Sequence, residues 1–277
     1  MQQTSAAPNL TSSLLASIGV AHGFSTRCGG VSRGVFDSLN FGNPGELAAE
    51  ERDPGANIAR NFRVLLDACG VEEPERKELV QVYQVHGGKT HIVRRGAVTH
   101  PGSPDPETGE TRDTKADAIV TDDPHRVLCI RTADCTPVLL ASGDGRVVGA
   151  VHAGWRGVIA GIARSAVEAM RSLGASDIAA CIGPCISVRH FEVGPEVVAE
   201  FRRVFGDAGP WRVVDPANPV SKGFVDLQAA LALQLREAGV ASIETLALCT
   251  VERGDLFFSH RRDKGRTGRM AAIIGPR

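Results

Sequence analysis

Two histidines and one cysteine in this sequence have the residue types and the placement of metal ligands. His86 in "QVHGG", Cys135 in "TADCTP" and His152 in "VHAGWRG" stand at the predicted ends of strands, beside glycines or turns. Strand ends present side chains to a pocket, and a neighbouring glycine keeps the backbone clear. Two imidazoles and a thiolate suit Zn²⁺ and leave a fourth position open for water or substrate. The residues therefore favour a zinc centre whose water is activated near neutral pH.

Two other interpretations of these residues stay open from the spacing alone. Cys135 can pack as a small hydrophobe, with His86 and His152 as hydrogen-bonded core residues. Alternatively, Cys135 is a nucleophile with His152 as its base, in a metal-independent dyad. No orienting carboxylate is evident for such a dyad, because Asp134 adjoins Cys135 and successive side chains on a strand point to opposite faces.

Copper chemistry fits the sequence less well than zinc chemistry. A multicopper oxidase needs many histidines, often as HxH pairs, and the eight histidines of this chain form no such pair. The residues therefore favour zinc over copper as the metal.

Composition limits the classes of partner. The chain has 277 residues, a formal net charge of −1 and 43% hydrophobic residues, which is ordinary for a globular protein. Nucleic-acid and membrane-surface partners demand a basic excess that this chain lacks. The first residues carry no Lys or Arg before a weakly apolar stretch, and the seven cysteines show no CxxC spacing. We expect a cytoplasmic protein that acts on a small molecule.

The apolar periodicity predicts strands interleaved with helices. Residues 1–13 are rich in Ser, Thr and Gln and are predicted to form a disordered tail, with residues 14–277 as a single α/β domain. Helices are predicted over 57–70, 155–173, 195–205 and 225–238, and strands over 116–121, 127–131, 137–142, 146–154, 243–249 and 270–274. The run 78–87 is expected to pair with 90–96 as a hairpin. Strands this apolar predict a mixed sheet that is covered on both faces.

Nine motifs in order resemble one known family. They are "FSTRCGGVSRGVFDSLNFG", "QVHGG", "ADAIVT", "TADCTPVLL", "VHAGWRG", "IGPCI", "FEVGPEV", "VDLQAAL" and "CTVERGDLFFSHRRDKGRTGR". Together they resemble the laccase-domain proteins, also called the polyphenol oxidase family or, in bacteria, the peptidoglycan editing factor family. The resemblance covers about residues 20–275.

The resemblance implies a fold, a metal site and an activity. It implies one α/β domain of mixed sheets in stacked layers flanked by helices, with zinc on His86, Cys135 and His152. It also implies phosphorolysis of adenosine, inosine and methylthioadenosine to the base and (methylthio)ribose 1-phosphate, with adenosine deaminase activity beside it. The alternative is a Cys-His amidase that edits peptidoglycan precursors; a metal-binding adaptor without turnover is a third hypothesis.

Four further residues of these motifs are candidate substrate contacts. Phosphorolysis needs cationic donors that hold phosphate without neutralising it, which suggests Arg27, Arg156 and Arg262. Asn40 in "SLNFG" is a candidate for a sugar hydroxyl. The family often has a tyrosine where this chain has His260, so a shift in base preference or pH dependence is expected if that side chain touches the substrate.

Overall fold

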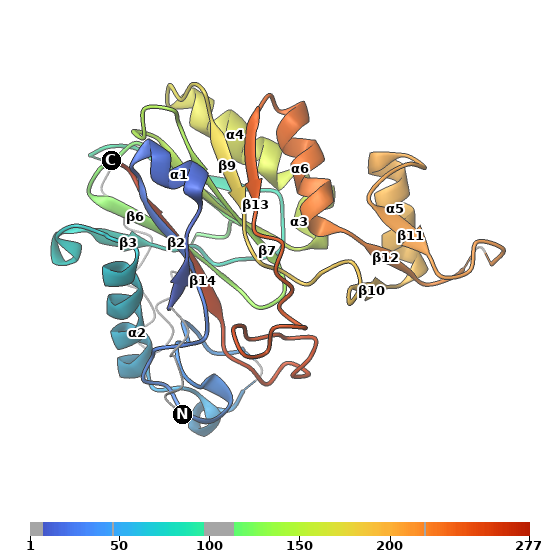
Figure 1. Cartoon of the computed structure of the whole chain (residues 1–277), viewed down its shortest axis with the longest axis horizontal. Helices are drawn as coiled ribbons and strands as arrows, with labels where there is room; N and C mark the ends of the chain where they lie inside the picture. The colour runs from blue at the N-terminus through green and yellow to red at the C-terminus, as the bar shows by residue number, and fades with distance from the viewer. Residues whose placement is uncertain (1–7, 46, 97–113, 219) are drawn as a thin grey trace.

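Two stacked mixed sheets form the centre of the molecule (Figure 1). The structure is a computed structural model that describes residues 8–45, 47–96, 114–218 and 220–277. Helices cover the outer face of each sheet, so the layers run helix, sheet, sheet, helix. The predicted α/β class with stacked mixed sheets is confirmed.

The first sheet has five strands. In spatial order they are β1 (Asn9–Leu10), β2 (Ala21–Ser25), β14 (Met270–Gly275), β6 (Arg126–Thr132) and β3 (Glu78–Val80). All neighbours are antiparallel except β3, which runs parallel to β6.

The second sheet has six strands. In spatial order they are β13 (Ser242–Thr245), β9 (Ala179–Ile182), β7 (Thr136–Ala141), β8 (Val148–Ala153), β5 (Ala118–Thr121) and β4 (Thr90–Val93). The outer pairs β13 with β9 and β4 with β5 are parallel, and the inner pairs are antiparallel.

Side-chain alternation along the strands divides the apolar residues between the layers. On β7, Val138 and Leu140 pack toward the helices, while Leu139 packs between the two sheets. On β6, Leu128 and Ile130 fill the space between the sheets, and their neighbours on the strand face α2. Both faces of the central strands are therefore buried, which explains why these strands are continuous apolar runs.

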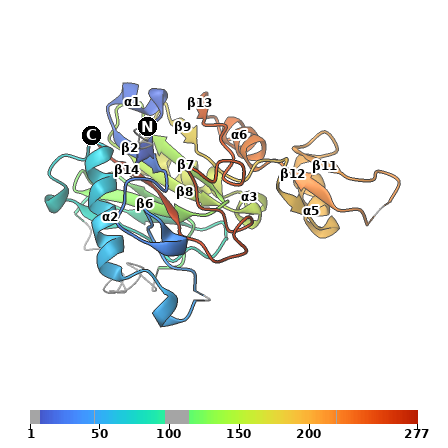
Figure 2. The ribbon, with the colours of Figure 1, turned by 60° about the horizontal axis from the view of Figure 1, so that its bottom comes forward.

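The helices are α1 (Ser13–Ile18), α2 (Gly55–Ala68), α3 (Trp155–Ile159), α4 (Ile162–Ser172), α5 (Pro195–Phe205) and α6 (Leu227–Glu237). Helix α2 covers the five-stranded sheet, and α4 and α6 cover the six-stranded sheet. Helix α5 packs on a small third sheet of β10 (Glu192–Val193), β12 (Gly223–Val225) and β11 (Trp211–Val213). This unit extends away from the stacked sheets as an arm (Figures 1 and 2). No helix among the described residues is long and apolar enough to cross a membrane.

Four sequence predictions differ from the structure. The strand predicted over 243–249 ends at Thr245 as β13. The helix predicted over 155–173 is divided into α3 and α4, because Gly161 takes a left-handed φ of +74° between them. The predicted hairpin of 78–87 with 90–96 is wrong, since β3 pairs with β6 and β4 pairs with β5. The tail predicted over 1–13 contains β1, paired with β2, and the α1 cap at Ser12; residues 1–7 lie outside the described part.

Candidate functional site

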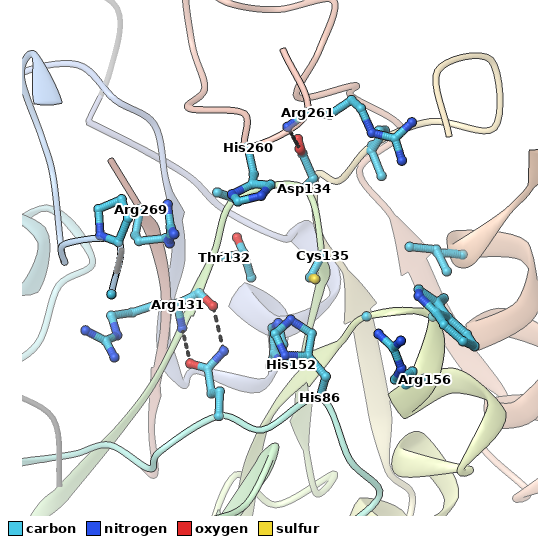
Figure 3. A pocket seen from close by; sticks show the side chains of 18 of the residues that line it. His86, Arg131, Thr132, Asp134, Cys135, His152, Arg156, His260, Arg261 and Arg269 are labelled. Atoms are coloured by element: carbon cyan, nitrogen blue, oxygen red, sulfur yellow. Dashed lines mark hydrogen bonds between the residues drawn. The ribbon is translucent and has the colours of Figure 1, made fainter. Parts of the chain in front are cut away.

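A pocket of about 1060 Å³ opens where several strand ends and loops meet. The chain reaches it after β3 at His86, after β6 at Cys135, and at the end of β8 at His152. The start of α3 and the loop that holds His260 complete its wall (Figure 3). Its volume is at the upper end of the range for small-molecule sites.

The three predicted ligands meet in this pocket. His86, Cys135 and His152, here called the His–Cys–His group, each offer a donor atom within 4.8 Å of the others. The two imidazole rings lie edge to face with their centroids 4.9 Å apart. Gly154 allows this approach, because a Cβ at that position would lie 3.0 Å from His86 Cδ2 and 3.1 Å from the Cys135 Sγ. Of the three, only His152 is a buried, hydrogen-bonded residue, whereas His86 is exposed and Cys135 is partly buried.

One buried carboxylate holds both histidines in place. Asp117, just before β5, is fully buried, and its Oδ1 accepts a hydrogen bond from His152 Nδ1 at 2.9 Å. The same carboxylate accepts the backbone N–H groups of Val85 at 3.3 Å, His86 at 2.9 Å and Gly87 at 2.6 Å. Because an ionised carboxylate only accepts, Nδ1 of His152 carries a proton, and Nε2 is the nitrogen left for the pocket.

The backbone at His86 is in an unusual conformation that these bonds maintain. Its φ is +59°, in the left-handed region that non-glycine residues rarely adopt. Successive N–H groups in such a turn form a concave anion site, and the Asp117 carboxylate occupies it. Asp117 therefore fixes the main chain of one candidate ligand and the ring of another.

Charges in the pocket favour the ionised forms of these groups. Burial opposes ionisation of Cys135, but the charge of His152 and hydrogen bonds from both histidines outweigh it, so the pKa of the thiol falls well below its ordinary value. Burial likewise opposes protonation of His152, but Cys135 and Asp117 raise its pKa. The pKa of Asp117 is lowered despite burial, because His152 and the Gly87 N–H donate to it.

Alkylation of the metal-free protein tests this electrostatic balance. With metal removed by chelator, iodoacetamide is expected to modify Cys135 readily at pH 7, where an ordinary thiol of pKa about 8.5 is mostly protonated. The rate is expected to fall as pH drops through the lowered pKa, because only the thiolate reacts. Peptide mass spectrometry separates Cys135 from Cys28, the other partly exposed cysteine. Equal rates at both cysteines at pH 7 would contradict a lowered pKa.

The donor set fits a transition-metal ion. Two imidazoles and a thiol that favours its thiolate form supply borderline and soft ligands within mutual reach. The Asp117 bond to His152 is the outer partner that metal-binding histidines usually have. The same group does not fit a cluster of several coppers, because among the described residues only two imidazoles and one thiol of this pocket lie within mutual ligand distance.

The four predicted substrate contacts divide between the pocket and the loops behind it. Arg156 lines the pocket, with its guanidinium 4.3 Å from the Trp155 ring centroid. Arg27, Arg262 and Asn40 are not among the described residues that line it.

Backbone and carboxylate partners explain why these three residues lie elsewhere. Arg27 donates to the carbonyls of residues 37 and 254, and Arg262 donates to those of residues 250 and 257 and to Asp263. Asn40 is buried, donates to Asp53, and accepts from the Arg269 N–H. Arg27 and Arg262 therefore hold loops in place through these carbonyls. Asn40 contacts the main chain of Arg269, which itself lines the pocket.

Sequence reasoning missed several residues that shape the pocket. Arg131 and Arg269 both line it. Gln84 also lines it, and its side-chain amide forms two 2.8 Å hydrogen bonds with the main chain of Arg131 (Figure 3). This clamp ties the loop that carries His86 to the strand that leads to Cys135. The signal in the sequence was an arginine at the end of each of two apolar runs. A charged side chain is uncommon in a strand with both faces buried, so its presence there suggests a functional position.

Comparisons with known proteins agree with this architecture. Residues 21–277 match the family model described as "Multi-copper polyphenol oxidoreductase laccase". A purine nucleoside phosphorylase of Deinococcus radiodurans is 35% identical over 271 residues, which cover 97% of this chain and 94% of that protein. The protein of Streptomyces griseus named purine nucleoside phosphorylase ORF3 is 38% identical over 260 residues, with 92% and 94% covered.

Solved structures share the whole fold. The crystal structure of YlmD from Geobacillus stearothermophilus superposes with a TM-score of 0.81 at 33% identity, covering 99% of this chain and 98% of that one. The Bacillus licheniformis hypothetical protein YfiH gives 0.78 at 30% identity, with 94% and 93% covered. The stacked mixed sheets and the family model together define the class of laccase-domain proteins. The chain belongs to this family, as its motifs predicted.

Proposed function

We propose that this protein is a zinc-dependent purine nucleoside phosphorylase. It converts adenosine, inosine and methylthioadenosine to the free base and (methylthio)ribose 1-phosphate, and it also deaminates adenosine. The observation that carries the proposal is the His–Cys–His group inside a cationic pocket, in a chain whose relatives over more than nine-tenths of its length are named purine nucleoside phosphorylase.

The charge of the pocket supports phosphate as the second substrate. Its described cationic lining residues are Arg52, Lys115, Arg131, Arg156, Arg261 and Arg269. The one acidic residue among the described lining is Asp134, whose oxygens accept from Thr250 at 2.6 Å and from the Arg261 N–H at 2.7 Å. A chain with a net charge of −1 therefore concentrates positive charge where the substrate binds, which favours an anion.

The residues of the chain have distinct tasks in this proposal. His86, Cys135 and His152 would hold the metal, and Asp117 keeps a proton of His152 on Nδ1, which leaves Nε2 as the nitrogen available for a metal. Zinc bound there would supply a Lewis acid that polarises an oxygen of a bound substrate or water. Trp155 offers a flat surface beside Arg156 for the base. His260 also lines the pocket, where it is placed to alter base preference relative to a tyrosine.

One observation favours the Cys-His amidase as a second candidate function. The sequence offered no orienting carboxylate for a dyad, yet Asp117 hydrogen-bonds to His152 Nδ1 while Cys135 lies on the other side of the ring. Cys135, His152 and Asp117 thus lie in a row in space, with the thiol next to the base and the base next to an orienting acid. A metal-independent thiol of this kind would cleave amides such as those of cell-wall precursors.

The cellular setting is part of the same proposal. Seven cysteines are present as free thiols, which is expected for a reducing cytoplasm. Small molecules remain the proposed partners, and residues 14–277 are proposed to act as one catalytic domain. The continuous core between the two sheets supports that proposal.

Product analysis tests the function. The purified zinc-loaded protein is incubated with adenosine, with and without phosphate, and adenine, ribose 1-phosphate and inosine are separated by chromatography. Phosphate-dependent adenine release that stops on chelation is expected. Activity on cell-wall amides that survives chelation but not iodoacetamide would instead support the second candidate. If a folded, zinc-loaded protein forms neither adenine nor inosine, the nucleoside proposal is wrong.

A further inference from the structure

The two sides of the pocket differ in chemistry. Arg131 and Arg269, here called the arginine wall, lie on one side of Cys135 and His152, while Arg156 lies on the other (Figure 3). This separation gives the pocket a direction, because a ligand that spans it meets different groups at its two ends.

The arginine wall is held in place by the surrounding main chain. The Arg131 backbone is clamped by the Gln84 amide, and its guanidinium packs against Gly42, where a Cβ would lie 2.7 Å from Nη1. The Arg269 N–H donates to Asn40 Oδ1 at 2.8 Å, and its Nη1 donates to the carbonyls of residues 267 and 268. Two preorganised guanidinium groups suit a phosphate better than a neutral ring, since their planar donors match phosphate oxygens.

The opposite side is mainly apolar. Its lining includes Trp155, Ile186, Phe191 and Leu227, which belong to one hydrophobic cluster. The cations here are stacked on aromatic rings, with the Arg156 guanidinium 4.3 Å from the Trp155 centroid and the Arg261 guanidinium 5.4 Å from that of Phe191. A planar guanidinium stacked on an aromatic ring also presents a flat face, so the Trp155–Arg156 pair offers a surface on which a purine ring can stack.

We infer that phosphate binds against the arginine wall and that the purine lies against Trp155, with the ribose between them beside the His–Cys–His group. This inference rests on the proposed phosphorylase function. It assigns Arg131 and Arg269 to phosphate. Arg156, which the sequence had suggested as a phosphate contact, is assigned to the side of the pocket that binds the base.

The reaction itself requires such an opposed arrangement. In phosphorolysis the C1′–N9 bond breaks and its electron pair leaves with the purine, while a phosphate oxygen forms a new bond to C1′. The proton that hydrogen phosphate gives up balances the proton that the purine gains. An incoming phosphate that displaces the base in line must stand on the face of C1′ opposite the base, which matches walls on opposite sides of the pocket.

The assignment is tested by measuring the KM for phosphate and the KM for adenosine in two sets of variants, one on each side of the pocket. Arg131→Gln and Arg269→Gln are expected to raise the KM for phosphate by about tenfold to hundredfold, because each removes charged hydrogen bonds to the anion, with a much smaller change in the KM for adenosine. Trp155→Ala and Arg156→Gln are expected to show the reverse pattern. Arg131→Lys should recover part of the loss, since it keeps the charge without the planar donors. Arg146→Gln, at an exposed arginine outside this pocket, is the matched control.

Thermal unfolding with inorganic phosphate separates this inference from the proposed function. Phosphate that binds the native state raises Tm by mass action, and the increase is expected to vanish in Arg131→Gln and persist in Arg156→Gln. If the wild-type protein turns over no nucleoside but shows this pattern, the phosphorylase function is wrong and the anion site stands. If Arg156→Gln loses the phosphate effect while Arg131→Gln keeps it, the inference is overturned even in an active phosphorylase.

Discussion

Replacing Cys135 by alanine is expected to lower phosphorolysis of adenosine by more than about a hundredfold. Loss of an outer partner of a metal ligand costs up to about a hundredfold in metal affinity or activity, and Cys135 is proposed as a ligand itself. The side chain is only partly buried, so its truncation leaves a smaller defect than a core mutation would. The initial rate of adenine release and the zinc content per chain are the two measurements.

The matched control is a cysteine of the neighbouring strand. Cys129 on β6 is fully buried in the core beneath α2, away from the pocket. Cys129→Ala is expected to cost about 1 kcal/mol of stability and to keep both zinc and turnover. Full activity of Cys135→Ala would refute the site assignment. A Cys135→Ala protein that retains zinc but loses all turnover would point to the thiol as a nucleophile.

The three candidate ligands could be singled out from the sequence because their signal is local. His86, Cys135 and His152 each stand beside a turn or glycine at the end of an apolar run, and Gly154 proves to be the residue that lets two of them approach. The apolar runs also predicted central strands with both faces covered, which the alternation on β7 confirms.

Asp117 could not be predicted, because its role depends on contacts between distant segments. In the sequence it is an acid at the start of "ADAIVT", where an aspartate commonly ends a loop. Its partners are residues 85–87 and 152, which are separated from it by about thirty positions on either side. Only the parallel pairing of β4 with β5 and the antiparallel pairing of β5 with β8 bring those segments to one place. The predicted hairpin of 78–87 with 90–96 was wrong, and it paired these segments with each other, so the contact of residues 85–87 with Asp117 could not be foreseen.

Motif membership alone did not distinguish the arginines that line the pocket from those that brace its loops. Arg27 and Arg262 stand in strong motifs, yet their guanidinium groups are used by carbonyls and by Asp263. Arg131 and Arg269 reach the pocket from the adjacent antiparallel strands β6 and β14 or their edges. Which arginine faces the pocket depends on strand register, because a one-residue shift moves every side chain of a strand to the opposite face.

Replacing Asp117 by asparagine is expected to weaken zinc binding by about tenfold to hundredfold. The carboxylate accepts from two donors at each oxygen, with His152 and His86 at Oδ1 and Gly87 and Val85 at Oδ2. An asparagine amide has one accepting oxygen, so in either orientation its NH₂ group faces N–H donors. If it faces His152, the ring can be satisfied only by moving its proton to Nε2, which then no longer has a lone pair for the metal.

Asp117→Asn is expected to lower both the stability of the fold and the affinity for zinc. One control variant separates these two effects. Buried donors left without acceptors cost about 1–3 kcal/mol each, so the metal-free Asp117→Asn protein is also expected to be less stable. Asp123, a buried carboxylate that accepts the N–H groups of His125 and Gly96, offers the same isosteric change outside the pocket. Asp123→Asn is expected to lower Tm without changing the Kd for zinc.

Zinc titration against a competing chelator, run on the wild type and both variants, gives the Kd values. Rescue by excess zinc is the further expectation for Asp117→Asn, because its three proposed ligands remain in the chain and only their alignment is impaired. Turnover that returns at high zinc with a raised apparent Kd would make Asp117 a positioning residue. If Asp117→Asn binds zinc like the wild type and yet cannot be rescued, the carboxylate acts on His152 as a base, and the thiol-based amidase becomes the better account of this site.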